Sequence, residues 1–240
     1  MVGSQEQVLG GGERVLEGRG QVPGAQRWVP KGADLDGLRA AAAHCRGCGL
    51  YEHATQTVFG RGDAHARVVM IGEQPGDMED RKGLPFVGPA GHLLRRAVDD
   101  AGLDPAQLYI TNAVKHFKFR STGKRRLHQT PTRVEIRACR PWLVAELAQL
   151  RPRAVVVLGA TAAQALLGPG FRITRMRGQV LPWPASAENP DEFVDHDGAF
   201  LVATVHPSSV LRADNQEIAY RSLVNDLTVV AERLAADERR

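Results

Sequence analysis

The sequence predicts an α/β fold, a three-layer α/β/α sandwich around a central, mainly parallel, four-stranded sheet. Short apolar runs alternate with segments of helical periodicity along the chain, which is the order of parallel strands connected by helices. The runs are continuously apolar rather than alternating, as is typical of strands covered on both faces. With 240 residues, 43% of them hydrophobic, the chain is long enough to bury one sizeable core.

Each element follows from a local pattern. The apolar runs predict strands at 67–72, 108–114, 153–159 and 200–205. Helical spacing and a capping Asp34 predict helices at 34–43, 88–101, 132–150, 161–167 and 218–234. Residues 1–28 are rich in Gly, Glu and Gln and are expected to form a disordered tail, so the domain spans 29–240. Residues 184–199 are expected to form a polar surface loop.

Composition excludes several classes of protein. No stretch is long and apolar enough to cross a membrane, and the first residues lack a secretory pattern. Three cysteines, an odd number, argue against a disulfide framework and favour a cytoplasmic location. The net charge of +4 is compatible with a polyanionic partner but decides little.

Conspicuous loops follow three of the predicted strands: 73–76, 115–117 and 206–209. Ligand sites of parallel sheets lie beyond the carboxyl ends of the strands, so these loops are expected to meet at one edge. Glu73 could there stabilise a developing cation, although a merely structural turn explains the same residues. His206 could donate a hydrogen bond or be a satisfied structural histidine. Residues 85–91 lead into a helix and could equally cradle a nucleotide phosphate.

A second group of residues can ligate a metal. Cys45 and Cys48 form a C-x-x-C pair, and Cys139 lies far downstream. His116 is the preferred fourth ligand, with His44 and His53 as alternatives. The spacing alone leaves zinc, an iron–sulfur cluster and a redox pair open, and Cys139 could simply be a small buried residue.

The segment 105–134 contains no Asp or Glu but many cations, with Phe117 and Phe119 among them. The cations are Lys115, Lys118, Arg120, Lys124, Arg125, Arg126 and Arg133. A basic loop with interleaved aromatic residues favours nucleic-acid binding over the alternative of a solvated surface loop. The same loop carries His128, which could act as a nucleophile or simply be a surface histidine.

Taken together, the motifs resemble the uracil-DNA glycosylase superfamily, specifically its iron–sulfur family 4 type. The motifs run in the family's order over most of the chain: Cys45-x-x-Cys48, Gly72–Gly76 (GEQPG), Gly83–Gly91 (GLPFVGPAG), Ile110–Lys115 (ITNAVK), Ala138-Cys139 and His206–Ser209 (HPSS). Three departures from the usual family 4 pattern resemble the UdgX branch, whose members become covalently attached to DNA. Gln74 replaces an alanine, His116 replaces a cysteine, and the loop gains Gly123–His128 (GKRRLH).

The resemblance implies a uracil-DNA glycosylase that becomes linked through His128 to C1′ of the abasic sugar. Its catalytic residues would be Glu73, His128 and His206. Substrate binding would fall to Gln74, Phe86, Asn112, Lys124, Arg125, Arg126 and Ser208. A 4Fe-4S cluster would be held by Cys45, Cys48, His116 and Cys139. The partner would be uracil-containing DNA, preferably single-stranded, bound by a monomer. The alternatives are a conventional turnover glycosylase and a non-catalytic, metal-stabilised DNA-binding module.

Overall fold

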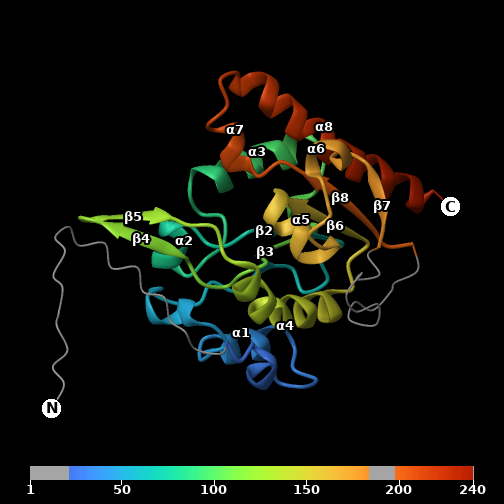
Figure 1. The fold of residues 1–240 in the computed structure, drawn as a ribbon. Coiled ribbons are helices and arrows are strands. Elements are labelled where there is room, and N and C mark those ends of the chain that lie inside the picture. Colours follow the sequence, from blue (N-terminus) through green and yellow to red (C-terminus); the bar gives the residue numbers. More distant parts are fainter. Residues whose placement is uncertain (1–21, 184–197, 240) are drawn as a thin grey trace, which may run out of the picture.

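The computed structural model describes residues 22–183 and 198–239, and they form a three-layer α/β/α sandwich (Figure 1). The central sheet has six strands rather than four, in the order β1-β3-β2-β6-β8-β7. The four predicted strands form its parallel centre: β2 (Val68–Gly72), β3 (Leu108–Asn112), β6 (Ala154–Leu158) and β8 (Phe200–Thr204). Both edges carry antiparallel strands, β1 (Arg61–Gly62) and β7 (Val180–Pro182), which are too short to show a periodic pattern.

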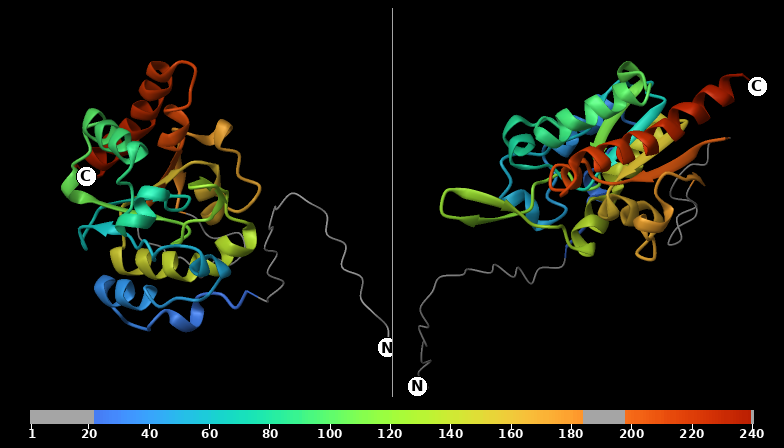
Figure 2. Two further views of the ribbon diagram at one scale, coloured as in Figure 1. Left: turned by 90° about the vertical axis from the view of Figure 1, so that its left-hand side faces the viewer. Right: turned by 90° about the horizontal axis from the view of Figure 1, so that it is seen from above.

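Two helical layers cover the sheet (Figures 1 and 2). One face is covered by α1 (Leu35–Ala42), α4 (Arg133–Leu150) and α5 (Ala160–Leu167). Their apolar residues form one core with the strand side chains that point towards these helices. On the other face α3 (Pro89–Asp100) and α8 (Gln216–Glu238) complete a second core. β2, β6 and β8 are buried at every position, as expected for strands covered on both faces.

The short helices were not predicted. They are α2 (Asp77–Lys82), α6 (Ile173–Met176), α7 (Pro207–Val210) and the 3₁₀ turns Gln26–Trp28, Gly49–Glu52 and Pro105–Gln107. The longer helices begin near their predicted starts. At the start of α4 the Thr132 side chain accepts a hydrogen bond from Glu135 N, and the Glu135 side chain accepts one from Thr132 N. Such a capping box satisfies two otherwise free amide groups. Within the described residues, no helix has the length and apolar character needed to cross a membrane.

The part of the basic segment that follows β3 was predicted to be a loop, but residues 119–128 form a β-hairpin. β4 (Phe119–Thr122) pairs antiparallel with β5 (Arg125–His128), and Thr122 lies opposite Arg125. Gly123, at φ +57°, takes the left-handed conformation that a two-residue hairpin turn requires. Figure 2 shows the hairpin extending away from the body of the molecule.

The start of the domain lies earlier than expected. Residues 22–28 were expected to belong to the tail, yet Ala25 is wholly buried and its amide donates to Ala138 O. Gly24 N likewise donates to Gly47 O. The segment therefore packs on α4 and on the loop that carries Cys45 and Cys48. The rest of the predicted tail, 1–21, and nearly all of the predicted loop, 184–197, lie outside the described residues.

Candidate functional site

The carboxyl edge of the sheet gathers the predicted catalytic residues. β2 and β3 are parallel neighbours with Gly72 opposite Asn112, so Glu73 follows one strand where Asn112 ends the other. β8 ends at Thr204, and His206 follows two residues later. Glu73 and His206, from two of the three predicted loops, thus lie at this edge together with Asn112, which ends β3. We call Glu73, Phe86, Asn112, His128 and His206 the rim cluster.

Phe86 is held in this cluster by its backbone. Its φ of +53° is left-handed, a strained value for an aromatic residue. Arg95 Nη1 donates to Phe86 O at 3.1 Å, and a Cβ on Gly91 would lie 1.8 Å from the same oxygen. The glycine therefore permits the close approach that fixes Phe86. The buried Phe86 ring lies 5.9 Å from the His206 ring, centroid to centroid.

Asn112 presents a free acceptor. Its side chain is 2% exposed, and Oδ1 accepts no hydrogen bond from the described residues. A buried amide oxygen without a partner is costly and is rare unless a ligand supplies the missing donor. A Cβ on Gly72 would lie 2.4 Å from Asn112 Oδ1 and 2.7 Å from Phe86 Cζ. Gly72 therefore leaves Asn112 and Phe86 room to lie together.

His206 is neutral and carries a defined tautomer. Burial lowers its pKa to about 4, helped by the neighbouring His128 and Arg212. Ser208 N donates to His206 Nδ1 at 3.2 Å, and Ser208 Oγ lies 2.8 Å from the same atom. Because Nδ1 accepts, the proton of the neutral ring resides on Nε2. Ser208, predicted to bind substrate, thus contacts His206 and leaves its Nε2–H free to donate.

Glu73 and His128 face each other across the sheet edge and the hairpin. His128 Nε2 lies 3.4 Å from Glu73 Oε1. This separation is long, and Glu73 Oε1 accepts no hydrogen bond among the described residues. The His128 side chain is half exposed, whereas that of Glu73 is 19% exposed. A carboxylate beside an accessible imidazole is a pairing that can activate or orient a nucleophile.

Gln74 holds the base of the hairpin. Its Nε2 donates to Lys118 O at 3.2 Å and Gln129 O at 3.0 Å, while its Oε1 accepts from Lys118 N at 2.9 Å. Lys118 and Gln129 flank β4 and β5. Both N–H donors of the side-chain amide are thereby used by the backbone on either side of the hairpin. A role of Gln74 in binding substrate stays a prediction.

Arg126 is a second tie between the hairpin and the body. Its Nε lies 2.5 Å from Asp77 Oδ1 and its Nη1 lies 2.6 Å from Asp80 Oδ2. Its guanidinium also stacks on Phe119, 5.0 Å from the ring centroid. Asp80 is wholly buried and accepts Thr55 N as well. Arg126 was predicted to bind substrate, but its charge is neutralised by two carboxylates, and sequence reasoning missed both of them.

The remaining cations of the hairpin face solvent. Lys124 and Arg125 lie exposed at the turn, and Arg120 is exposed on β4. Lys118, in contrast, pairs with Glu135 at 2.9 Å. The surface available to a phosphate backbone is therefore centred on the tip of the hairpin.

The predicted metal ligands lie in one region, between α1, α4 and the segment after β3. The three cysteines and His116 are all buried. Backbone or indole N–H groups donate to two of the sulfur atoms: Gly47 N and Trp142 Nε1 to Cys45 Sγ, and Lys115 N to Cys139 Sγ. Such donors stabilise thiolates. Burial raises the pKa of Cys48 to about 11 and that of Cys139 to about 12, which a bound cation would reverse.

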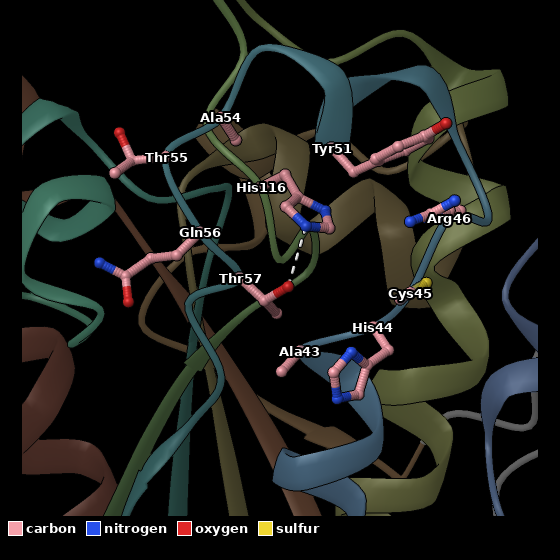
Figure 3. A pocket seen from close by; sticks show the side chains of 10 residues that line it. All are labelled: Ala43, His44, Cys45, Arg46, Tyr51, Ala54, Thr55, Gln56, Thr57 and His116. Carbon is pink, nitrogen blue, oxygen red and sulfur yellow. Dashed lines mark hydrogen bonds between the residues drawn. The ribbon is translucent and has the colours of Figure 1, made fainter.

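His116 borders a hollow of about 220 Å³ together with Cys45 and His44 (Figure 3). The Thr57 hydroxyl donates to Ala42 O at 3.0 Å, so in its 2.9 Å contact with His116 it accepts from Nε2–H. Burial lowers the pKa of His116 to about 4, which leaves Nδ1 with a free lone pair. The donor set suits a soft metal centre. Across residues 22–183 and 198–239, however, no three or more such side chains are grouped closely enough to hold an ion.

Comparison with known proteins identifies the family of this α/β/α chain. The profile of the Uracil DNA glycosylase superfamily matches residues 59–228. The chain belongs to this superfamily. It is 35% identical to the type-4 uracil-DNA glycosylase of Thermotoga maritima over 72% of this chain and 81% of the relative.

Two further type-4 uracil-DNA glycosylases are similar. That of Pyrobaculum aerophilum is 34% identical over 75% of this chain and 85% of its own length. The enzyme of Archaeoglobus fulgidus is 33% identical over 78% of this chain and 88% of its own length. The family 4 resemblance of the motifs is therefore confirmed, while assignment to the UdgX branch rests on Gln74, His116 and the hairpin.

Proposed function

We propose that this protein excises uracil from DNA and becomes covalently attached to C1′ of the resulting abasic sugar through His128. The observation that carries the proposal is the position of the His128 imidazole, 3.4 Å from Glu73 at the edge of the rim cluster. A hairpin tied down by Gln74 and Arg126 places it there. Membership of the superfamily supports the excision step.

Base recognition would use Phe86 and Asn112. To reach buried side chains, a target base has to leave the stack of the DNA. Phe86 would stack on the uracil ring, and the Asn112 amide would pair with one donor and one acceptor of its edge. The unpartnered Oδ1 of Asn112 would accept the N3–H of uracil. Cytosine carries an acceptor at N3 and would leave this oxygen unpaired, which disfavours its binding.

Breaking the N-glycosidic bond would send its electron pair to uracil and leave a positive charge on the sugar. His206 Nε2–H would donate to a uracil oxygen and stabilise the anion. The Glu73 carboxylate would stabilise the cationic sugar. A neutral His206 suits this role because its donor needs no ionisation at neutral pH.

His128 would then take the place of the attacking water. One of its ring nitrogens supplies the electron pair of the new bond to C1′, and the ring becomes a substituted imidazolium. Loss of the proton on its other nitrogen, to Glu73 or to water, leaves a neutral alkylated imidazole. Such a group leaves poorly, so we expect one reaction per molecule.

The thiolates of Cys45, Cys48 and Cys139 and the Nδ1 atom of His116 would hold a 4Fe-4S cluster, by the chemistry of the donor set and the type-4 relationship. The cluster would contribute structure rather than electron transfer. We also propose that the substrate is preferentially single-stranded DNA, that the protein acts as a monomer, and, from its odd number of cysteines, that it acts in the cytoplasm.

The test is a denaturing gel. Purified protein is mixed with a labelled single-stranded oligonucleotide that contains one uracil, heated in detergent and separated, with the matching thymine oligonucleotide as control. A heat-stable shifted band that requires uracil is expected. Alkali-labile breaks without a shifted band would mean a conventional turnover glycosylase. Neither breaks nor a shift would favour the non-catalytic DNA-binding module.

A further inference from the structure

We infer that a buried ion pair, Lys115–Glu146, is the positioning device of the base-reading turn that contains Asn112. The inference rests on the proposed function and deepens it. Lys115 and Glu146 are 1% and 0% exposed, and Lys115 Nζ lies 2.5 Å from Glu146 Oε2. Neither residue contacts the substrate in the proposed reaction, so both would act through Asn112.

Lys115 closes the turn that follows β3. Its Nζ donates to Asn112 O at 2.8 Å and to Thr111 Oγ1 at 2.7 Å, besides Glu146. An ammonium group has three protons, and these three acceptors use all of them. The side chain therefore folds back over the turn and fixes the main chain of the residue whose amide is expected to read uracil.

Glu146 anchors the ammonium from α4. Its Oε1 accepts from Gly60 N at 3.2 Å, from Tyr109 OH at 3.0 Å and from Thr111 Oγ1 at 2.9 Å. Three segments far apart in the sequence thus converge on one carboxylate: the loop before β1, strand β3 and helix α4. The anchor is rigid because every donor around it is buried or on the backbone.

The same turn also contacts the main chain of Glu73. Ala113 N donates to Gly72 O at 2.9 Å, and Val114 N donates to Glu73 O at 3.0 Å. The residues between Asn112 and Lys115 thereby extend the β2–β3 pairing past the end of both strands. A shift of this turn would move Asn112 and Glu73 together, the two groups that have to face the base and the sugar.

Stability alone gives little reason to bury this pair. Taking an ammonium and a carboxylate out of water costs several kcal/mol per ion, and well-packed apolar replacements are often as stable or more so. A buried pair with all its hydrogen bonds satisfied does fix geometry. Tight placement matters here, because misplacing reacting groups by about 1 Å can slow a reaction on the order of 10²-fold.

The experiment compares a charge-free double variant with the wild type. Lys115→Met with Glu146→Gln removes both charges and the donor to Asn112 O, yet keeps an acceptor for Tyr109 and Gly60. We expect wild-type circular dichroism and unchanged affinity for a thymine oligonucleotide. The single-turnover rate of uracil excision at saturating protein should fall on the order of 10²-fold. Inhibition by free uracil should weaken at least about tenfold, a loss of about 1.4 kcal/mol.

Tyr109→Phe is the matched control, because it removes a donor to Glu146 Oε1 but leaves Lys115 paired with Asn112 O. We expect it to lower the melting temperature without changing inhibition by uracil. Thr111→Val withdraws one hydrogen bond of Lys115 Nζ with little change of shape. It should move both readouts of the double variant by a smaller factor, and it supplies the test if the double variant does not fold.

The inference is overturned if the folded double variant, or Thr111→Val in its place, excises uracil at the wild-type rate with unchanged inhibition by uracil. It is also overturned if Tyr109→Phe weakens inhibition by uracil as much as the double variant does. A wild-type protein that releases no uracil would instead refute the proposed function, and the inference with it. The wild-type lane thus separates the two failures.

Discussion

Glu73 and His128 lie 3.4 Å apart, and in the proposed reaction these two residues face C1′ of the sugar. Glu73 follows a buried strand at the sheet edge, whereas His128 ends the hairpin. In the proposed reaction Glu73 serves bond cleavage from the central sheet, whereas His128 acts from the hairpin. Removing His128 should leave cleavage possible, because Asn112, Phe86 and His206 do not depend on the hairpin for their positions.

His128→Ser tests this division. Without the imidazole, water can reach the cationic sugar, so we expect the covalent product to disappear while uracil and abasic DNA are released with turnover. Released uracil is measured by chromatography and the adduct by denaturing gel. Glu73→Gln is the companion variant, since it should suppress both products by on the order of 10²-fold or more. A His128→Ser protein that still crosslinks, or Glu73→Gln with full activity, would contradict the assigned roles.

His206 makes the stability of the fold depend on pH. Its pKa is about 4 in the folded protein and about 6.5 in an unfolded chain. Between these values the unfolded chain binds a proton that the folded protein refuses, so the free energy of unfolding falls as pH falls. The contribution is complete above about pH 6.5 and is lost progressively towards pH 4. Urea unfolding at pH 7 and pH 5 should show a smaller difference for His206→Gln than for the wild type.

At the scale of elements, the hairpin is held to the body of the molecule at two levels. Gln74 binds the backbone on either side of it, and Arg126 joins its second strand to α2. The outer cations, Lys124 and Arg125, remain exposed at the tip. Adjacent arginines thus have different roles: Arg126 fixes the hairpin, and Arg125 is free to meet DNA.

Arg126→Gln and Arg125→Gln form a matched pair for this distinction. Arg126→Gln leaves the buried Asp80 carboxylate without its cation. Breaking a buried ion pair in this way lowers the free energy of unfolding by about 3–5 kcal/mol. We therefore expect a lower melting temperature and slower crosslinking. Arg125→Gln should leave the melting temperature unchanged and reduce the salt dependence of single-stranded DNA binding by about 0.7 in log–log slope for each phosphate that is no longer neutralised. Equal effects of the two substitutions on stability would refute the distinction.

For the whole molecule, the local patterns of the sequence are enough to predict the parallel centre of the sheet and the five longer helices. Continuous apolar runs and helical spacing act over neighbouring residues, and they also place Glu73 and His206 just after predicted strands, whereas Asn112 was singled out only by the family resemblance. The edge strands were not predicted, because segments of two or three residues are too short to show a hydrophobic period. The hairpin was not predicted, because the charges of the segment were taken as the sign of a loop. Gly123 was the residue that could have indicated its turn.

The contacts that position the site could not be predicted from the sequence in the same way. Gln74 meets the backbone of Lys118 and Gln129, and Lys115 meets Glu146, across 31 or more residues of chain. Such partners are selected by tertiary placement and not by local spacing. The residue types gave no warning either, because a lysine beside a cluster of cations resembles a phosphate contact until its burial is known.

The cysteine region offers the last prediction, because it joins the first segment of the domain to the rest. Cys45 and Cys48 follow α1, Cys139 lies in α4 and His116 lies beyond β3. A cluster bound there would tie these elements together as a ligand that binds only the folded state, and its binding free energy would add to stability.

Cys139→Ser should remove iron and labile sulfide, both measured chemically, and lower the melting temperature. Because His128 and Glu73 lie on other elements, the residual folded protein should still crosslink uracil-DNA at low temperature. Unchanged iron and sulfide content in Cys139→Ser would exclude this cysteine as a ligand, and a wild-type protein without iron would refute the cluster altogether.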